Sequence, residues 1–134
     1  MKEMPIDMIS GIPMIYVHFW SRLKNKYRSI FLTLDTGATI TTISKDALRA
    51  LGYVGCGKNK KRITTASGIE YVDEVVLDKV MFGGFELLDV PVYAHTFPQE
   101  SFSSGGVIGM NVLSNFDVFI SFQRRILQLT KVCD

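Results

Sequence analysis

Apolar residues fall in short runs or alternate with polar ones along most of the chain, and the runs are rich in β-branched and aromatic side chains. Runs of this kind, bounded by turn-forming residues, are typical of strands. Many short strands at close spacing indicate an all-β domain, either a small closed barrel or a folded-over sheet. The pattern predicts strands over residues 12–20, 28–34, 39–43, 63–66, 69–77, 80–82, 85–88, 90–94, 117–122 and 126–130.

Two short segments carry helical signals instead. Ser44 has the features of an N-cap, Asp46 follows in the first turn, and Gly52 closes the stretch. Residues 110–115 favour one helical turn. The chain ends, residues 1–10 and 131–134, show no clear strand pattern, and we expect them to be loosely ordered.

Length and composition fit one folded domain. The chain has 134 residues, of which 47% are hydrophobic and 21% charged, and it shows no repeat and no linker. We therefore interpret residues 1–134 as a single domain. The net charge of +2 is too small to indicate a nucleic-acid partner. Since no signal peptide or bilayer-spanning apolar stretch is visible, we expect a cytoplasmic protein with no membrane partner.

The segment Asp35-Thr36-Gly37-Ala38 follows the predicted strand 28–34 and offers candidate catalytic chemistry. Gly37 permits a sharp turn and close approach of a partner, and the Thr36 hydroxyl can lock the loop by hydrogen bonding. Two carboxylates that share one proton can hydrolyse a peptide bond, because the ionised one activates a water and the protonated one donates to the carbonyl oxygen. The alternative interpretation is an ordinary turn, since Asp, Thr and Gly are common turn formers.

Three segments in this order resemble the retropepsin-like (retroviral-type) aspartic proteases. Residues 31–39 resemble the apolar lead and catalytic loop of that family. Residues 65–68 form a small-residue hairpin tip where the family carries its substrate-covering flap. Residues 107–113 resemble the segment of two apolar residues and a glycine, followed by a helix, that threads behind the catalytic loop. The final hairpin, residues 116–129, resembles that of bacterial members.

The resemblance implies the retropepsin-like acid protease fold and an aspartic endopeptidase that needs neither cofactor nor metal. It also implies a homodimer, with the active site on the two-fold axis, that acts on a protein or peptide substrate. The roles it implies are catalysis for Asp35, support of the active-site loop for Thr36, Gly37, Ala38, Val107, Ile108 and Gly109, and a substrate-binding flap for Thr65, Ala66, Ser67 and Gly68.

The sequence independently calls for a second chain. It contains one Asp-Thr-Gly, and Asp117, which lies between aromatic and β-branched residues at a strand start, is interpreted as structural. If the chemistry needs two carboxylates and one chain holds one, a two-fold interface must supply the other. The rival hypothesis is a non-catalytic retropepsin-fold module for dimerisation or peptide binding, because fold does not imply function.

Several features depart from the family pattern or suggest other chemistry. Gly68 is the one glycine of the expected flap tip, and residues 95–106 form a long loop that is either a second lid or plain surface. Residues 52–59 nearly spell a phosphate-binding loop, but Asn59 replaces the required Ser or Thr and no strand precedes them. His18 and His95 have no partner at metal-ligand spacing, so we expect no metal site.

Overall fold

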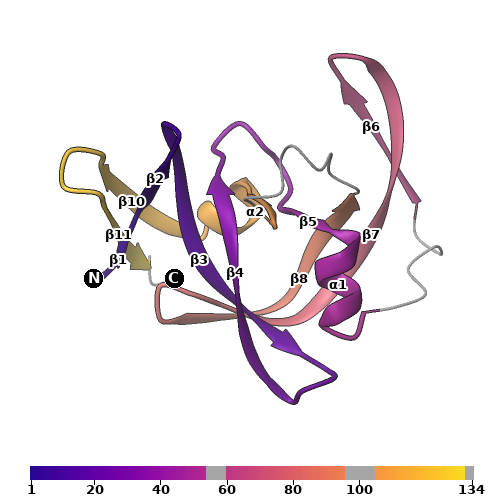
Figure 1. The fold of residues 1–134 in the computed structure, drawn as a ribbon, viewed down its shortest axis with the longest axis horizontal. Coiled ribbons are helices and arrows are strands. Elements are labelled where there is room, and N and C mark those ends of the chain that lie inside the picture. Colours follow the sequence, from indigo (N-terminus) through magenta and orange to yellow (C-terminus); the bar gives the residue numbers. More distant parts are fainter. Residues whose placement is uncertain (54–59, 96–104, 132–134) are drawn as a thin grey trace.

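The computed structural model describes residues 1–53, 60–95 and 105–131 (Figure 1). Strands dominate these ranges, and the two helices are short, so the predicted all-β fold class is confirmed. The elements are β1 (Lys2–Pro5), β2 (Asp7–Ile9), β3 (Ile12–Ser21), β4 (Lys26–Leu34), β5 (Thr42–Ser44), α1 (Lys45–Ala50), β6 (Lys60–Thr65), β7 (Gly68–Phe82), β8 (Phe85–His95), β9 (Gly106–Ile108), α2 (Met110–Leu113), β10 (Phe116–Ser121) and β11 (Ile126–Lys131).

The strands form two sheets. The smaller sheet has the order β1-β11-β10, and the larger has the order β2-β3-β4-β9-β5-β8-β7-β6. In the larger sheet β3 also pairs with β7, where His18 lies opposite Met81 and Phe19 opposite Val80. The sheet therefore folds over onto itself without forming a regular barrel, which is the second of the two predicted forms.

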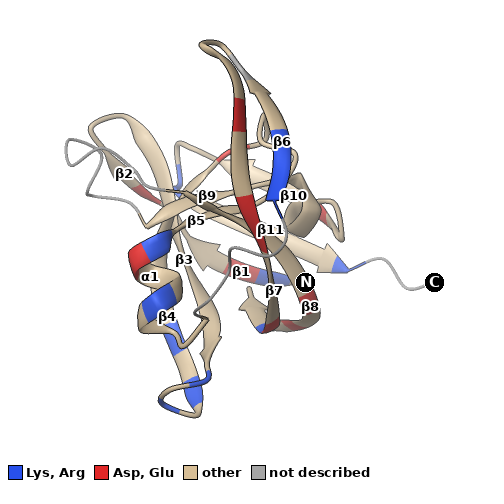
Figure 2. Cartoon of the chain, turned by 90° about the vertical axis from the view of Figure 1, so that its right-hand side faces the viewer, with Lys and Arg blue, Asp and Glu red and all other residues tan. Residues whose placement is uncertain are grey.

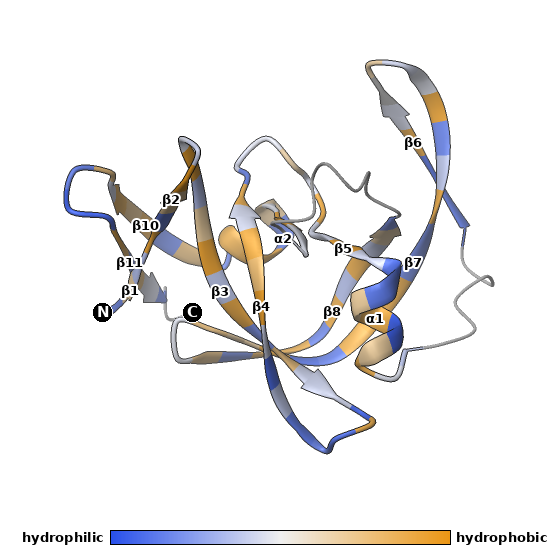
Figure 3. Cartoon of the chain, in the orientation of Figure 1, coloured by the Kyte–Doolittle hydropathy of each residue, from blue (hydrophilic) through white to orange (hydrophobic). Residues whose placement is uncertain are grey.

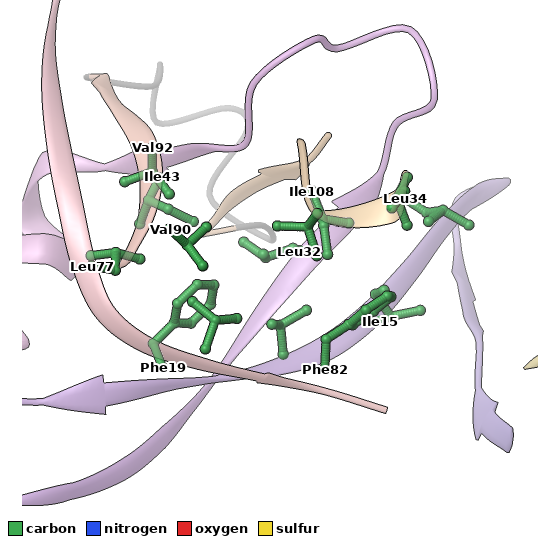
Figure 4. Packing of buried hydrophobic residues seen from close by; sticks show 14 of the residues in the cluster. Ile15, Phe19, Leu32, Leu34, Ile43, Leu77, Phe82, Val90, Val92 and Ile108 are labelled. Atoms are coloured by element: carbon green, nitrogen blue, oxygen red, sulfur yellow. The ribbon is translucent and has the colours of Figure 1, made fainter. Parts of the chain in front are cut away.

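The hydrophobic core lies inside this fold-over. Along β3, the exposed residues Tyr16 and His18 alternate with the buried residues Val17 and Phe19, as expected for a strand with one face on the core. Figure 4 shows Phe19 and Phe82 packed among apolar side chains from the other strands, and Figure 3 shows the same alternation along the ribbon. Burial of this apolar surface is the main term that stabilises the fold.

The long hairpin β7–β8 differs from the sequence prediction, which divided it into four shorter strands. Leu77 pairs with Val90 and Lys79 with Leu88, so the ladder passes over Asp78 and Asp89 without ending. Asp89 has a φ of 53°, and the backbone N–H of Asp78 donates to the Tyr53 hydroxyl at 3.0 Å. Aspartate is common in turns and therefore suggests the end of a strand in a sequence. Here the two aspartates mark a local irregularity within strands that continue.

A charged contact ties the beginning of the β3–β4 connection to β7. The Arg22 guanidinium donates two hydrogen bonds of 2.9 Å to the Asp78 carboxylate. This guanidinium holds the pKa of Asp78 below its usual value. Figure 2 shows further basic residues along the β3–β4 hairpin and on β6, with acidic residues on β7.

The N-terminal residues are ordered as strands, so the expectation of a loose segment over residues 1–10 is wrong. β1 pairs antiparallel with β11, and β2 pairs antiparallel with β3. Each is only three or four residues long, too short to show a clear alternation, and the partner of β1 comes from the opposite end of the chain. At the C-terminus β11 ends at Lys131, and residues 132–134 lie outside the described ranges.

Candidate active site

Asp35 begins a tight turn directly after β4 ends at Leu34. Its backbone N–H donates to the Ile108 carbonyl at 3.1 Å, and its own carbonyl accepts from the Ala38 N–H at 3.2 Å. The Gly37 N–H donates to Asp35 Oδ1 at 2.9 Å. Asp35 as a residue is partly buried, and hydrogen bonds hold both its backbone and its side chain. Such fixation is what a catalytic group on a loop requires.

Strand β9 passes directly behind this turn. It runs parallel to β4, with Leu34 opposite Ile108, and antiparallel to β5, with Thr42 opposite Val107. Gly106 makes the passage possible, because a Cβ atom there would lie 2.0 Å from the Thr42 carbonyl oxygen. The end of β4 is therefore held between β3 and β9, and β9 is held in turn by β5.

The beginning of α2 supports the turn through backbone hydrogen bonds. The Met110 N–H donates to the Ala38 carbonyl at 2.7 Å, and the Asn111 N–H donates to the Thr39 carbonyl at 3.0 Å. Gly109 lies against the turn so closely that an added Cβ would be 2.7 Å from the Ala38 oxygen. The predicted loop residues of positions 35–38 and 107–109 are thus brought into direct contact.

Thr41 and Asn111 also hold the site, and the sequence analysis missed both. The Thr41 hydroxyl accepts from the Gly109 N–H at 3.0 Å and donates to Asn111 Oδ1 at 2.9 Å. The same Oδ1 accepts from the Thr41 N–H at 2.8 Å, and Asn111 Nδ2 donates to the Pro91 carbonyl at 2.7 Å. Their signal in the sequence is weak: Thr41 is one of several threonines in its segment, and Asn111 is a single polar residue within an apolar stretch. We call this pair the Thr41–Asn111 clasp.

The predicted flap residues lie at the tip of the β6–β7 hairpin. Thr65 pairs with Gly68, and the two-residue turn is Ala66-Ser67, one residue earlier than expected. Gly68 has a φ of 127°, a conformation that favours glycine. Figure 1 shows this hairpin and the turn after β4 both projecting toward the upper side of the molecule.

Ion pairs join the two arms of the hairpin and its base. Lys60 Nζ on β6 lies 3.0 Å from Asp73 Oδ1 on β7, and His95 Nε2 at the end of β8 lies 3.6 Å from Glu70 Oε2. The second contact is an ion pair only when His95 is protonated. Ile69 and Tyr71 on β7 are largely exposed, so the hairpin presents apolar side chains to its surroundings.

Two other predicted features lie largely outside the described residues. Residues 54–59 of the near phosphate-binding loop and residues 96–104 of the possible second lid lie outside the described ranges. Within the described ranges, His, Cys, Asp and Glu side chains form no group of three or more that could hold a metal ion. Neither helix of the described part has the length and apolar character needed to cross a bilayer.

Comparisons with known proteins identify the family and the fold. The aspartyl protease family matches residues 25–112, while no match is found among curated protein sequences. A retropepsin-like aspartic protease from Rickettsia conorii matches in structure with a TM-score of 0.69 at 20% identity, over 95% of this chain and 87% of that one. The EIAV protease, in complex with an inhibitor, gives a TM-score of 0.57 at 16% identity, over 77% of this chain and 86% of that one. The chain therefore belongs to the aspartyl protease family, and its fold is retropepsin-like.

Proposed function

We propose that this protein is an aspartic endopeptidase that acts as a homodimer, with Asp35 of each chain as the catalytic carboxylate. The observation that carries the proposal is the fixation of Asp35. Its carboxylate is anchored by the Gly37 N–H, and its turn is supported by β9 and α2. An ordinary surface turn has no need of two further elements, β9 and α2, to hold its backbone in place.

The second carboxylate comes from a second copy of the chain. One chain contains a single Asp-Thr-Gly, and the proposed chemistry needs two carboxylates that share a proton. Two like charges so close cannot both ionise easily, so the pair titrates as a unit. The ionised carboxylate then takes a proton from water, while the protonated one donates to the oxygen of the scissile carbonyl. No covalent intermediate forms in this scheme, and no metal takes part.

The substrate is an extended segment of peptide that lies between the two Asp35 turns and the β6–β7 hairpins. Backbone hydrogen bonds to an extended peptide supply affinity, and side-chain pockets supply specificity. The exposed Ile69 and Tyr71 on the hairpin are apolar surfaces available for such contacts. In this proposal the tip residues 65–68 act as the flap over the substrate.

Replacing Asp35 by Asn tests the proposal. Asn keeps the shape and can still accept from the Gly37 N–H, so we expect the variant to fold and dimerise like the wild type. Cleavage should fall by at least about 1,000-fold, because neither proton transfer can proceed without the carboxylate. Digestion of a peptide library with both proteins across a range of pH measures this. Asp7→Asn, at an exposed aspartate on β2, is the matched control and should cleave normally.

The pH profile adds a second readout. The dyad is competent while it holds one proton, so cleavage should be fastest at mildly acidic pH. Full activity of the Asp35→Asn variant, or an alkaline optimum with no acidic limb, would contradict the proposal. A wild-type protein that binds peptides but never cleaves them would favour the non-catalytic module.

A further inference from the structure

The two sheets have four edge strands in the described part of the chain, and β10 differs from the other three. Edge strands expose unpaired backbone groups, and proteins protect them by shortening them or by placing Lys or Pro on them. β1 carries Lys2 and Pro5, β6 carries three consecutive basic residues, and β2 has only three residues. β10 has six residues with no Lys, Arg or Pro, and so lacks each of these protections.

The side chains of β10 are also unusually apolar for an exposed edge. Phe119 is 55% exposed, and Phe122, just beyond the strand, is exposed to the same extent. Asp117 is the one charged residue of β10. An exposed apolar edge of this kind is either a site of aggregation or a site of specific pairing.

An apolar pocket connects this edge to the catalytic turn. It has a volume of ≈ 170 Å³. Its lining includes Leu34 from the end of β4, Thr36 from the turn, Met110 and Leu113 from α2, and Val118 and Ile120 from β10. Since Thr36 directly follows Asp35, whatever covers this pocket lies next to the catalytic carboxylate. The occupant that the chemistry demands at this position is another Asp35 turn.

We propose that β10 pairs antiparallel with β10 of a second copy of the chain, which joins the two small sheets into one six-stranded sheet across the two-fold axis. This inference rests on the proposed function, because that function requires the second copy. The apolar pockets of the two copies then lie on the same side of the joined sheet, next to each other across the two-fold axis. The strand order becomes β1-β11-β10 followed by β10-β11-β1 of the partner.

The alternation of side chains restricts the register. Opposite residues in an antiparallel pair point to the same face, so a one-residue slip would turn the pocket side chains outward. The two-fold axis must therefore lie between two copies of the same residue, one from each chain. Centred on Phe119, the pairing places Val118 opposite the partner's Ile120 and the two Phe119 rings opposite each other. Centred on Val118, it would place Asp117 against the partner's Phe119, so the structure favours Phe119.

The chain termini take no direct part in this dimer. β1 pairs with β11 of its own chain and lies on the far side of the small sheet from β10. Its backbone groups facing β11 are already satisfied. The pairing surface is therefore built from residues just after α2, which also carries the support for the catalytic turn.

Phe119→Lys tests the pairing surface. The change places two ammonium groups against each other at the axis and removes two aromatic contacts, so we expect the dissociation constant of the dimer to rise at least about tenfold. Sedimentation velocity over a concentration series measures this constant. Leu88→Lys is the matched control, because Leu88 is an equally exposed apolar residue on β8 and lies away from the proposed surface. Circular dichroism verifies that both variants are folded.

Cross-linking provides a second, independent measurement. Cβ atoms of opposite residues are about 4.5–5.5 Å apart in an antiparallel pair, close to the separation that a disulfide needs. With Cys56 and Cys133 replaced by Ser, Phe119→Cys should form a covalent dimer on mild oxidation. Leu88→Cys in the same background should form at least about tenfold less.

The outcomes separate this inference from the proposed function. A wild-type chain that stays monomeric, a Phe119→Lys variant that dimerises like Leu88→Lys, or equal cross-linking at both cysteines would overturn the β10 pairing. If cleavage depends on Asp35 but Phe119→Lys leaves the dissociation constant of the dimer unchanged, the proposed function stands and the β10 pairing surface is rejected. If Phe119→Lys breaks the dimer but the wild type never cleaves peptides, the β10 pairing surface stands and the proposed function is rejected.

Discussion

Thr41 shows how a single buried hydroxyl can hold together backbone segments that lie far apart in the chain. It is 1% exposed, and its hydroxyl is the hydrogen-bond acceptor for the backbone N–H of Gly109. It also donates to Asn111, whose amide reaches the Pro91 carbonyl on β8. The Thr41–Asn111 clasp therefore joins the segment that follows the Asp35 turn, the start of α2 and β8 through two side chains.

Thr41→Val keeps the shape of the side chain and removes the hydroxyl. The buried Gly109 N–H then loses its acceptor, so we expect the free energy of unfolding to fall by about 1–3 kcal/mol. We also expect kcat to fall by about 10- to 100-fold, because small displacements of a catalytic group are costly. Urea unfolding and steady-state kinetics measure the two effects.

Thr130→Val is the control for this experiment. Thr130 is exposed on β11, and surface changes of this kind are typically within about 0.5 kcal/mol. If Thr41→Val behaved like Thr130→Val in both measurements, the clasp would have no role in positioning Asp35.

The junction of β9 and α2 is the element on which the site depends. β9 brings its backbone between β4 and β5, and α2 then donates its first N–H groups to the carbonyls of Ala38 and Thr39. Gly109 lies at this junction with a φ of −110°, a conformation open to any residue. Its requirement for glycine is therefore a matter of space rather than of backbone conformation.

Gly109→Ala would place a methyl group 2.7 Å from the Ala38 carbonyl oxygen. Because the contact is with backbone of the Asp35 turn, relief requires the turn to move. We expect a loss of about 1–3 kcal/mol in the free energy of unfolding together with a fall in kcat/KM of at least about tenfold. Thermal unfolding and peptide cleavage assays measure these changes.

Gly84→Ala separates stability from activity. Gly84 has a φ of 87°, so alanine there is strained, but its nearest neighbour would be a flexible Lys2 side chain at 3.7 Å. We expect a loss of stability of about 1–2 kcal/mol with unchanged kcat/KM. A normal kcat/KM for Gly109→Ala would show that the turn tolerates displacement and would weaken the positioning argument.

At the scale of the whole molecule, the proposed active site belongs to two chains and is complete in neither. This arrangement predicts that inactive chains inhibit active ones by forming mixed dimers with them. When the wild type is mixed with an equal amount of Asp35→Asn and subunits exchange freely, cleavage per wild-type chain should fall to about half. With Asp35→Asn in large excess, cleavage should approach zero.

A peptide cleavage assay at fixed wild-type concentration measures this inhibition. Asp35→Asn combined with Phe119→Lys is a useful control, because a chain that dimerises poorly should inhibit much less. Cleavage that is proportional to the wild-type chains alone, whatever the excess of Asp35→Asn, would show that one chain suffices.

The features that could be predicted from the sequence are those determined by neighbouring residues. The strands alternate locally, so β3 and β4 were expected close to their observed bounds. The helix α1 was expected because its cap is local, and in the structure the Ser44 side chain accepts from the Ala47 N–H. Asp35 became the candidate catalytic residue because its turn residues directly follow it.

What only the tertiary structure decided depends on residues far apart in the chain. The insertion of β9 between β4 and β5 joins residues about 70 positions apart, and no local pattern specifies which backbone will approach another. The Thr41–Asn111 clasp, the continuous β7–β8 hairpin and the pairing of β1 with β11 have the same origin. The sequence therefore determined which residue could react, and long-range packing decided how that residue is held.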